Sequence, residues 1–497
     1  MPEVELKFAV DERDRERIAR ASPLAGARSV RRRLVTLYLD TPDALLWKRG
    51  MALRLRQSGS RWIQSLKGGR SGRGGLHTRD EWEFDRPDAS IDLALFAATP
   101  LARLPGADRL HERLAVAFAV DMVRTAWVVS PARATRLEVA LDVGEARAGG
   151  RAERICELEI ECLEGPVGAA FDLAARLLDD VPMRASAITK AQRGWRLFQD
   201  ERPKPQKARG VALDPSMPLE RAAREVVGAA VEQLEANEEG VIAGTDPEFV
   251  HQARVALRRL RSALRMFRRT IGRKRSRAWR SELARLSAAL GAARDRDVFA
   301  LESLPAVLCA PSSAGFADRV ANAAQARAKR ERRRAARAIA AAPPARTLLA
   351  ISRWLADVDD ERAPEREPLP AFAARVLGKR HDRVLAHARH PGRLDAAGRH
   401  RLRIEAKRLR YGVEGLASLF ASQRTKSYRD ALAELQDTLG QANDAANAAR
   451  LVVELDAPPA FVRAARRQFA AKARGHGERI ASLVRRLRQA GAPGSAR

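Results

Sequence analysis

The sequence predicts an α+β protein in which an antiparallel β-barrel with flanking helices precedes an all-α domain made of two duplicated helical bundles. Three observations support this prediction. Several segments within residues 1–200 alternate apolar and charged residues with the period of a β-strand. Beyond residue 218 the chain is rich in Ala, Leu and Arg and has a helical period. A His–Arg pattern in that region recurs 149 residues further along, which indicates an internal duplication.

Charge divides the chain into two parts with different electrostatic roles. Its 497 residues include 92 Lys and Arg against 62 Asp and Glu, a net charge of +30. Residues 1–200 hold 33 bases and 29 acids, so residues 201–497 hold 59 bases and 33 acids. The excess of +26 in the second part predicts a polyanionic partner there.

A domain boundary is expected at "QDERPKPQKARGVALDPSMP" (199–218), which holds four prolines and no sustained periodicity. We therefore predict a first domain at 1–200, a linker at 201–217 and a second domain at 218–497. Cys156, Cys162 and Cys309 form neither a CxxC pair nor a metal-ligand spacing, which is typical of a reducing compartment. No signal peptide and no apolar run of roughly 18–20 residues is visible, so we expect a cytoplasmic protein that does not engage a membrane.

The first strand is expected at "EVELKF" (3–8), where Val4, Leu6 and Phe8 alternate with two acids and a base. The same alternation recurs in "ALRLRQ" (52–57), "WIQSLKG" (62–68), "RDEWEF" (79–84), "RLEVALDVG" (136–144) and "ICELEIECL" (155–163). Each of these segments therefore has one apolar face and one face that concentrates charge.

An open sheet with one wet face would also show charged residues, but such faces normally mix Ser, Thr, Lys, Gln and Glu. A closed barrel explains the clusters better, because helices cover its apolar outer faces and the charged inner faces line a tunnel. Carboxylates suit Mg²⁺, whereas Arg and Lys suit phosphates, so the tunnel would serve phosphoryl transfer. The alternative is that some of these residues, above all Glu83 and Glu161, form internal salt bridges and nothing more.

The segments also resemble, in order, the motifs of the CYTH superfamily, the triphosphate tunnel metalloenzymes. Glu3-x-Glu5-x-Lys7 is similar to the family's ExExK signature. It is followed by "YLDTPD" (38–43), "LRLR", "SLKG", the Arg79-x-Glu81-x-Glu83 strand, "DMVRTAW", "LDVG", "ELEIE" and "ITKAQRGW" (188–195). The resemblance covers residues 1–200 and implies an eight-stranded tunnel that binds a triphosphate-bearing substrate with Mg²⁺ or Mn²⁺. Thr189 stands where the family's pattern has Ser before the lysine, and it keeps the hydroxyl.

The resemblance further implies roles for individual residues. The catalytic phosphate contacts would be Lys7, Arg54, Arg56, Lys67, Arg124 and Lys190. Metal ligation and orientation of the attacking water would fall to Glu3, Glu5, Asp142, Glu157 and Glu159. The same tunnel would be lined, in roles that the pattern does not separate, by Arg79, Glu81, Glu83 and Glu138.

Two segments of the second domain each carry a basic stripe beside an apolar one. The first, "VHQARVALRRLRSALRMF" (250–267), has spacings of 3, 4, 3 and 4 between His251, Arg254, Arg258, Arg261 and Arg265. Asp246 and Pro247 predict the N-terminus of this helix. The second, "LDAAGRHRLRIEAKRLRYGVEGL" (394–416), has spacings of 3, 4 and 3 between His400, Arg403, Lys407 and Arg410. One such stripe alone would most simply be a solvated helix face.

The repeat changes this interpretation. "LGAARD" (290–295) and "LGQAND" (439–444) are 149 residues apart, the same offset that separates His251 from His400. A duplication of this kind would bring the two stripes together across a pseudo-two-fold axis as one basic surface or channel. Tyr411 has Ser262 as its counterpart, so the two copies are not expected to be equivalent binders.

The paired pattern H-x-x-R-x-x-x-[RK]-R-x-R, followed each time by LG-x₂-[RN]-D, resembles the CHAD family, the conserved histidine α-helical domains, over roughly residues 218–490. The resemblance implies two four-helix bundles around a basic groove that binds inorganic polyphosphate. The nine stripe residues named above would be its anion contacts, and Asp295 and Asp444 would cap or brace helices. The run "KRERRR" (329–334) is expected to be solvated helix surface.

The sequence thus predicts an inorganic triphosphatase that converts tripolyphosphate to pyrophosphate and phosphate, joined to a polyphosphate-binding domain and associated with polyphosphate granules in the cytoplasm. One alternative is a catalytically silent tunnel in a protein that only docks on polyphosphate. Another is an enzyme for thiamine triphosphate, a nucleoside triphosphate or the cyclisation of ATP. With 3 Tyr and 14 Phe, and no Phe, Tyr or Trp among the stripe residues, the chain argues against single-stranded nucleic acid. A non-specific DNA binder stays an alternative.

Overall fold

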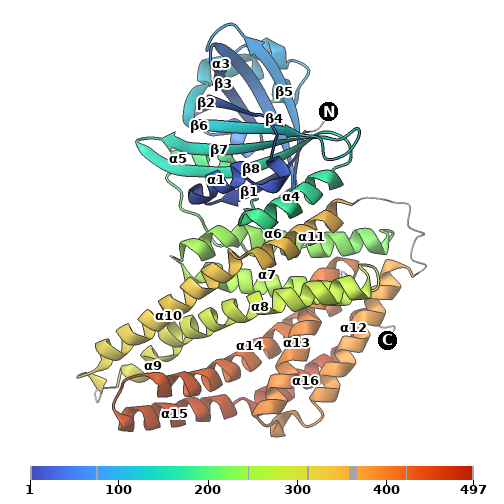
Figure 1. Ribbon diagram of the computed structural model, residues 1–497. Helices are drawn as coiled ribbons and strands as arrows, with labels where there is room; N and C mark the ends of the chain where they lie inside the picture. The colour runs from blue at the N-terminus through green and yellow to red at the C-terminus, as the bar shows by residue number, and fades with distance from the viewer. Residues whose placement is uncertain are drawn as a thin grey trace. The chain divides into compact units, whose positions relative to one another are not determined.

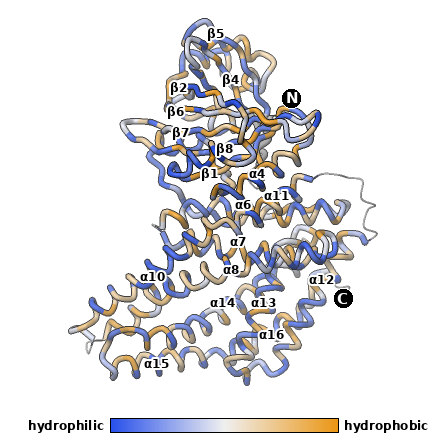
Figure 2. The backbone as a smooth tube through the Cα atoms, viewed as in Figure 1, coloured by the Kyte–Doolittle hydropathy of each residue, from blue (hydrophilic) through white to orange (hydrophobic). Residues whose placement is uncertain are grey.

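The computed structural model describes residues 3–73, 76–244, 246–310, 313–357, 367–420 and 423–494 (Figure 1). It divides into two compact units. Unit 1 comprises Met1–Lys204 and Ala340–Val358, and unit 2 comprises Pro205–Ile339 and Asp359–Arg497. Hydrophilic and hydrophobic residues alternate along the strands and helices of both units (Figure 2).

Unit 1 is built on an antiparallel sheet. Its strands are β1 (Glu3–Val10), β2 (Ser29–Asp40), β3 (Ala52–Ser58), β4 (Arg61–Arg73), β5 (Leu76–Arg86), β6 (Ala115–Val129), β7 (Arg136–Ala148), β8 (Arg151–Glu164) and β9 (Met183–Ala185). In the described part of the chain their order is β5-β4-β3-β2-β6-β7-β8-β1-β9, and β1 also pairs with β5. That pairing closes the first eight strands into a ring, which confirms the predicted barrel. The short ninth strand pairs with Phe8–Val10 of β1, beyond the residues of β1 that pair with β5.

The apolar faces of these strands pack outward, as the alternation predicted. Leu6 and Phe8 of β1 are at most 1% exposed and join an apolar cluster with Phe171 and Leu177. Both of these belong to the helix that covers this side of the barrel, α4 (Gly168–Asp180). The other helices of residues 1–204 are α1 (Arg15–Ala19), α2 (Leu45–Lys48), α3 (Leu110–Arg113) and α5 (Lys190–Phe198).

One helix of unit 1 comes from far along the sequence. Helix α11 (Ala342–Ala356) packs against α4 and β9 (Figure 1). Its Leu349 is 4% exposed within the same apolar cluster, and Arg346 donates to the carbonyl oxygen of Leu178 at 2.9 Å. Arg353 forms an ion pair with Asp172 of α4. This segment therefore differs from the predicted second domain, residues 218–497, because its apolar face completes the core of the barrel unit.

The described residues of unit 2 form helices and connecting segments, with no strand among them. Its helices are α6 (Leu219–Ala243), α7 (Pro247–Met266), α8 (Arg273–Val298), α9 (Pro305–Leu308), α10 (Ala317–Ile339), α12 (Leu369–His387), α13 (Ala396–Leu416), α14 (Gln423–Leu451), α15 (Pro459–Arg474) and α16 (Gly477–Ala490). Adding 149 to the first residues of α6, α7 and α8 gives positions within one residue of the starts of α12, α13 and α14. The helices thus repeat at the offset found in the sequence.

The two basic stripes lie on helices that touch. Helix α7 carries the first stripe, α13 carries the second, and the two helices pack against each other. Asp246 caps α7 by accepting a hydrogen bond from the backbone N–H of Glu248 at 2.7 Å, and Pro247 occupies the first turn. Among the described residues, no helix is both long and apolar enough to cross a membrane.

Candidate functional site

A cavity of about 500 Å³ lies inside the barrel and gathers most of the predicted tunnel residues. Among the described residues, six bases line it, namely Lys7, Arg54, Arg56, Lys67, Arg124 and Lys190. Six acids line it as well, namely Glu5, Glu81, Glu83, Glu138, Glu159 and Glu161. Asp142 and Glu157 lie directly behind this lining and are 0% and 1% exposed. The side chains of Glu3 and Arg79, which were predicted to join them, lie outside the described residues.

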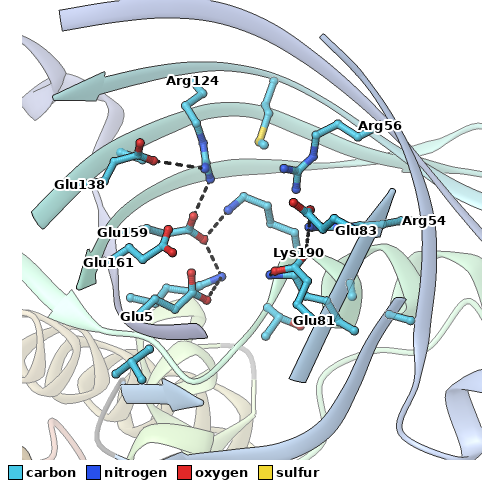
Figure 3. A pocket seen from close by; sticks show the side chains of 18 of the residues that line it. Glu5, Arg54, Arg56, Glu81, Glu83, Arg124, Glu138, Glu159, Glu161 and Lys190 are labelled. Carbon is cyan, nitrogen blue, oxygen red and sulfur yellow. Dashed lines mark hydrogen bonds and ion pairs between the residues drawn. The ribbon is translucent and has the colours of Figure 1, made fainter. Parts of the chain in front are cut away.

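Strand register explains why opposite charges meet in this cavity. Lys7 of β1 lies opposite Glu159 of β8, and Arg124 of β6 lies opposite Asp142 of β7. Because side chains at facing positions of an antiparallel pair project to the same side, each base lies beside an acid of the next strand. Figure 3 shows Glu5, Glu138, Glu159 and Glu161 on one wall, with Arg54, Arg56, Glu81 and Glu83 on the other.

Glu159 is the centre of the ion network on the first wall. Its carboxylate lies 2.8 Å from the Nζ of Lys7, 2.6 Å from the Nζ of Lys190 and 2.6 Å from the Nη2 of Arg124 (Figure 3). Burial would raise the pKa of Glu159, but Lys190, Lys7 and Arg124 outweigh burial and hold that pKa well below its usual range. The carboxylate is therefore ionised at every physiological pH, and it holds two lysines toward the cavity.

Lys190 is positioned by the start of α5. Thr189 caps this helix in a capping box with Gln192, so the lysine that follows projects into the barrel. Its Nζ also lies 2.7 Å from Asp142, and the surrounding carboxylates outweigh burial to raise the pKa of Lys190 well above its usual value. One turn on, Arg193 contacts Glu157 at 3.4 Å and Glu153 at 2.6 Å. Arg193 was missed in the sequence, although its spacing of three from Lys190 indicates the same helix face.

The opposite wall holds a smaller network around Glu81. Arg54 contacts Glu81 at 2.5 Å and donates to the hydroxyl of Ser65 at 2.6 Å, and Lys67 contacts Glu81 at 2.9 Å. Burial, followed by the neighbouring Glu81, raises the pKa of Glu83. These pairs fix the orientation of the second wall by joining β3, β4 and β5.

Arg56 differs from the other tunnel bases. No ion pair joins it to a carboxylate of the described residues, and its buried Nε has no hydrogen-bond partner there. Burial, together with Arg54 and Arg124, lowers the pKa of Arg56 to about 10. A half-buried guanidinium without an acidic partner is costly in free energy, and an anion in the cavity would remove that cost.

Three carboxylates form a row across neighbouring strands. Glu5 of β1 lies opposite Glu161 of β8, which lies opposite Glu138 of β7. All three line the cavity (Figure 3). Facing like charges repel, so a cation between them would be stabilising. Within the described chain, no set of three or more His, Cys, Asp or Glu is already arranged to hold a metal ion.

In unit 2, the two stripes converge on a central cluster, which we define as Arg254, Arg258, Arg403 and Lys407. Burial, followed by Arg258, Arg403 and Arg254, lowers the pKa of Lys407 to about 6. The buried Nε of Arg403 has no hydrogen-bond partner in the described structure. Asp295 braces the cluster by accepting a hydrogen bond from Arg254 at 3.3 Å.

The remaining stripe residues lie outside the central cluster. Arg261 and Arg265 continue along α7 toward Arg280 and Arg408. Arg410 instead donates to Glu414 at 2.7 Å and to Gln436 at 2.8 Å. His251 is half-buried and His400 is exposed at the start of its helix. In the run 329–334, Arg332 is an exception to the expected solvated surface, because it forms an ion pair with buried Asp297.

Known proteins resemble both parts of the chain. Residues 1–195 match the model of the CYTH domain, and residues 225–453 match the model of the CHAD domain. An inorganic triphosphatase from Haemophilus influenzae is 32% identical over 162 residues, which cover 32% of this chain and 44% of that protein. The chain therefore spans less than half the length of this relative.

Solved structures resemble each part as well. The CHAD domain from the plant Ricinus communis is 32% identical, with a TM-score of 0.49, over 58% of this chain and 96% of that chain. A protein from Hippeastrum, described as having a dominant triphosphatase activity, is 17% identical, with a TM-score of 0.30, over 40% of this chain and 97% of that chain.

Proposed function

This chain carries a CYTH domain followed by a CHAD domain, and on that premise we propose that unit 1 is a metal-dependent inorganic triphosphatase and that unit 2 binds inorganic polyphosphate. Unit 1 would convert tripolyphosphate to pyrophosphate and phosphate. The observation that carries the proposal is the matched set of bases and acids around one cavity in the described barrel. Phosphoryl transfer needs both, because its catalysis consists largely of positioning and charge neutralisation. The name of the Haemophilus influenzae relative supports the same reaction.

The bases would bind the phosphate oxygens. Arg56 is the first candidate, since it already lies in the cavity without a carboxylate partner among the described residues. Arg54 lies next to it on β3, Lys67 lies further along the same wall opposite Ala52, and Arg124 and Lys190 line the cavity from β6 and α5. A chain of three phosphates could thus be contacted from both walls at once. Such contacts fix the scissile bond in place and offset its negative charge.

The carboxylates would hold the metal ion. Glu5, Glu161 and Glu138 supply hard oxygen donors on one wall, whereas the Oε2 of Glu157 is already paired with Lys190 at 3.2 Å and with Lys7 at 3.5 Å. This donor chemistry fits Mg²⁺ or Mn²⁺, which prefer a few protein carboxylates together with phosphate oxygens. When bound, such an ion polarises the phosphoryl oxygen and activates water. Lys7 and Lys190 contact Glu159 and keep its carboxylate ionised.

Unit 2 would bind polyphosphate through the central cluster. The central cluster presents four bases from two touching helices. Two acids, Asp295 and Asp444, partly offset this positive charge. Such an excess of positive charge suits an anion with many closely spaced charges. Polyphosphate has this property and needs no aromatic side chains for recognition. Binding of this kind would also associate the protein with polyphosphate granules in the cytoplasm.

The test of the enzymatic proposal is phosphate release by the purified full chain. Tripolyphosphate, ATP and thiamine triphosphate are supplied in parallel, each with Mg²⁺, with Mn²⁺ and with a chelator. We expect metal-dependent turnover that is fastest for tripolyphosphate. Faster turnover of ATP or thiamine triphosphate would replace the inorganic substrate with an organic one. No turnover of any substrate, with long-chain polyphosphate still bound, would show a binding protein with a silent tunnel.

A further inference from the structure

Unit 2 has a large cavity of its own, which lies beyond the central cluster at the end of α7. This cavity, which we call the corner pocket, measures about 810 Å³ and is formed by α7, α8, α12 and α13. Its main basic residues are Arg265, Arg280, Lys379, Arg380, Arg383 and Arg408. Apart from Arg265, none of them was recognised in the sequence as an anion contact.

The corner pocket is strongly unbalanced in charge. Among the described residues, nine bases and two acids line it. Each of the two acids already has a basic partner, since Glu367 pairs with Arg375 at 2.5 Å and Glu405 pairs with Arg408. No ion pair to a described carboxylate is made by Arg265, Arg280 or Arg383. The positively charged side chains of this pocket repel one another, and a bound anion with several charges would offset that repulsion.

Arg380 shows that the pocket is an organised part of the fold. It comes from α12, is 9% exposed, and donates to the hydroxyl of Ser262 at 3.3 Å and to the carbonyl oxygen of Arg408. It thereby ties α12 to α7 and α13. Burial, followed by Arg265 and Arg408, lowers the pKa of Arg380 to about 10. A buried arginine held only by neutral oxygens is kept at a cost in folding stability, which is typical of a binding site.

The duplication provides an internal comparison, because each pocket residue has a counterpart 149 positions away. Arg265 corresponds to Glu414, Arg280 to Arg429, Arg380 to Val231, Arg383 to Leu234 and Arg408 to Arg259. Of these counterparts, Glu414 and Arg429 line a cavity of about 140 Å³ between α13 and α14, where Arg410 is bonded to Glu414. The repeated fold therefore does not by itself produce a basic pocket. One copy has it, whereas the other keeps Arg429 and Arg259 but has Glu414, Val231 and Leu234 in place of the other three bases.

The basic stripe of α7 runs from the central cluster to the corner pocket, because it includes Arg258 of the cluster and Arg265 of the pocket. Arg261 lies between them on α7, where burial, then Arg280, Arg258 and Arg408, lower its pKa. From His251 to Arg265, the stripe extends for 14 residues, or about 21 Å at the rise of an α-helix. A tripolyphosphate ion could occupy one part of this track, whereas a long chain could follow all of it.

We infer that the corner pocket is a binding site for a run of condensed phosphates, present in one copy of the duplication only. The inference rests on the proposed polyphosphate function and deepens it, because it makes the polyphosphate site one-ended instead of symmetric. The phosphates could belong to a long polyphosphate chain that continues from the central cluster, or to a short free ion such as tripolyphosphate. Both present the same closely spaced oxygens to the same guanidinium groups.

The experiment compares two variants of the full chain. The double variant Arg280→Gln/Arg383→Gln removes two bases of the pocket, and Arg429→Gln removes the counterpart of Arg280 as a matched control. Binding of long-chain polyphosphate and of tripolyphosphate is measured by calorimetry at fixed ionic strength, with a chelator present to prevent hydrolysis. Thermal unfolding verifies that each variant is folded, and triphosphatase turnover verifies that the barrel unit is intact. Turnover is expected to stay unchanged, because the pocket lies outside the barrel unit.

We expect the double variant to bind long-chain polyphosphate at least about tenfold more weakly, with a salt dependence reduced by about two phosphate contacts. Arg429→Gln should bind like the wild type. If the double variant instead loses one equivalent of tripolyphosphate, the pocket holds the short free ion. Wild-type binding of both ligands by the double variant, or equal losses in Arg429→Gln, would overturn the inference. A wild-type protein that does not bind long-chain polyphosphate would refute the proposed function itself.

Discussion

The barrel cavity and the corner pocket are both lined by charged residues, yet their charges are arranged in opposite ways. Among the described residues, the barrel cavity has six bases and six acids, and most of the bases touch an acid of a neighbouring strand. The corner pocket has nine bases against two acids in the same described chain. A balanced site can receive an anion together with a metal ion, whereas an unbalanced one can receive only an anion. This difference separates a site suited to catalysis from a site suited to binding.

The same comparison explains how each site is kept stable without its ligand. In the barrel, Glu159 and Lys190 neutralise one another, so both charges are compatible with burial. In unit 2, neutral oxygens hold Arg380, and burial lowers the pKa of Lys407 to about 6. The barrel should therefore tolerate the loss of its ligand well, whereas unit 2 should gain stability when an anion binds.

The largest effect is expected from Arg56, the tunnel base that has no carboxylate partner among the described residues. Arg56→Gln removes a guanidinium that has no carboxylate partner in the described structure, so it disturbs no ion pair. We expect kcat/KM for tripolyphosphate to fall by about 10²–10³, as for the loss of one preorganised donor to a developing charge. Steady-state phosphate release measures the change, with Arg61→Gln, at an exposed base at the start of β4 that does not line the cavity, as control. Equal activity in both variants would remove Arg56 from the site.

A substitution in α11 tests whether the stability of the barrel unit depends on this segment from far along the sequence. Leu349→Ala should destabilise unit 1 by about 2 kcal/mol or more, because it leaves a void in the cluster shared with α4. The control Leu301→Ala makes the same chemical change at a side chain that is 51% exposed. Denaturant unfolding followed by tryptophan fluorescence gives both free energies. For the same reason, residues 1–204 expressed alone should be less stable than the barrel in the full chain.

In the central cluster, Arg258→Gln should weaken binding of long-chain polyphosphate about tenfold and lower its salt dependence by about one phosphate contact. Arg410→Gln should have a smaller effect, because Arg410 is already bonded to Glu414 and Gln436. A salt titration of affinity measures both variants. A larger loss of affinity in Arg410→Gln than in Arg258→Gln would show that Arg410 contacts polyphosphate, and it would favour a symmetric site.

The smallest expected effect is a pH dependence of binding. Lys407 has a pKa of about 6, set by burial and then by Arg258, Arg403 and Arg254, with Asp444 opposing them. Below about pH 6 the amine of Lys407 is already protonated. Above that pH, binding of the anion has to be coupled to uptake of a proton by this amine, which weakens the apparent affinity. Affinity should therefore fall as pH rises from about 6 to 8, by less than about tenfold per unit.

The neighbouring groups and a second variant separate Lys407 from other titrations. His251 is the nearby group that could also titrate, but burial and then Arg294 lower its pKa, with Glu248 opposing them and Arg254 and Arg258 adding to the lowering. Lys407→Gln should abolish the pH dependence, whereas His251→Gln should keep it. The free energy of unfolding should also rise with pH above about 6, since the unfolded chain holds the proton that the folded chain has lost. A slope that persists in Lys407→Gln would assign the titration elsewhere.

The sequence predicted the parts of the molecule that depend on local periodicity. Alternation along β1 placed Lys7 inside and Leu6 outside, and the order of the strands was consistent with a closed ring. The offset of 149 residues also revealed that α7 and α13 are counterparts. These features follow from side-chain spacing, which the sequence records directly.

The features that depend on distant packing could not be predicted in this way. The apolar face of α11 was visible, but nothing in its pattern indicates that α4 is its partner. The stripe on α13 suggested that Arg410 faces the groove. In the structure, Arg410 is instead bonded to Glu414, the acidic residue that corresponds to Arg265 in the other copy. Arg380 lies outside both stripes, and only its position on α12 brings it to the corner pocket.

The most direct test of the central claim is to measure two quantities on the same preparations of Arg56→Gln and Arg258→Gln. The quantities are the turnover of tripolyphosphate with Mg²⁺ and the affinity for long-chain polyphosphate at one ionic strength. We predict that Arg56→Gln loses turnover and keeps affinity, and that Arg258→Gln loses affinity and keeps turnover. If either variant loses both properties together, catalysis and polyphosphate binding are not divided between the balanced cavity and the basic cluster.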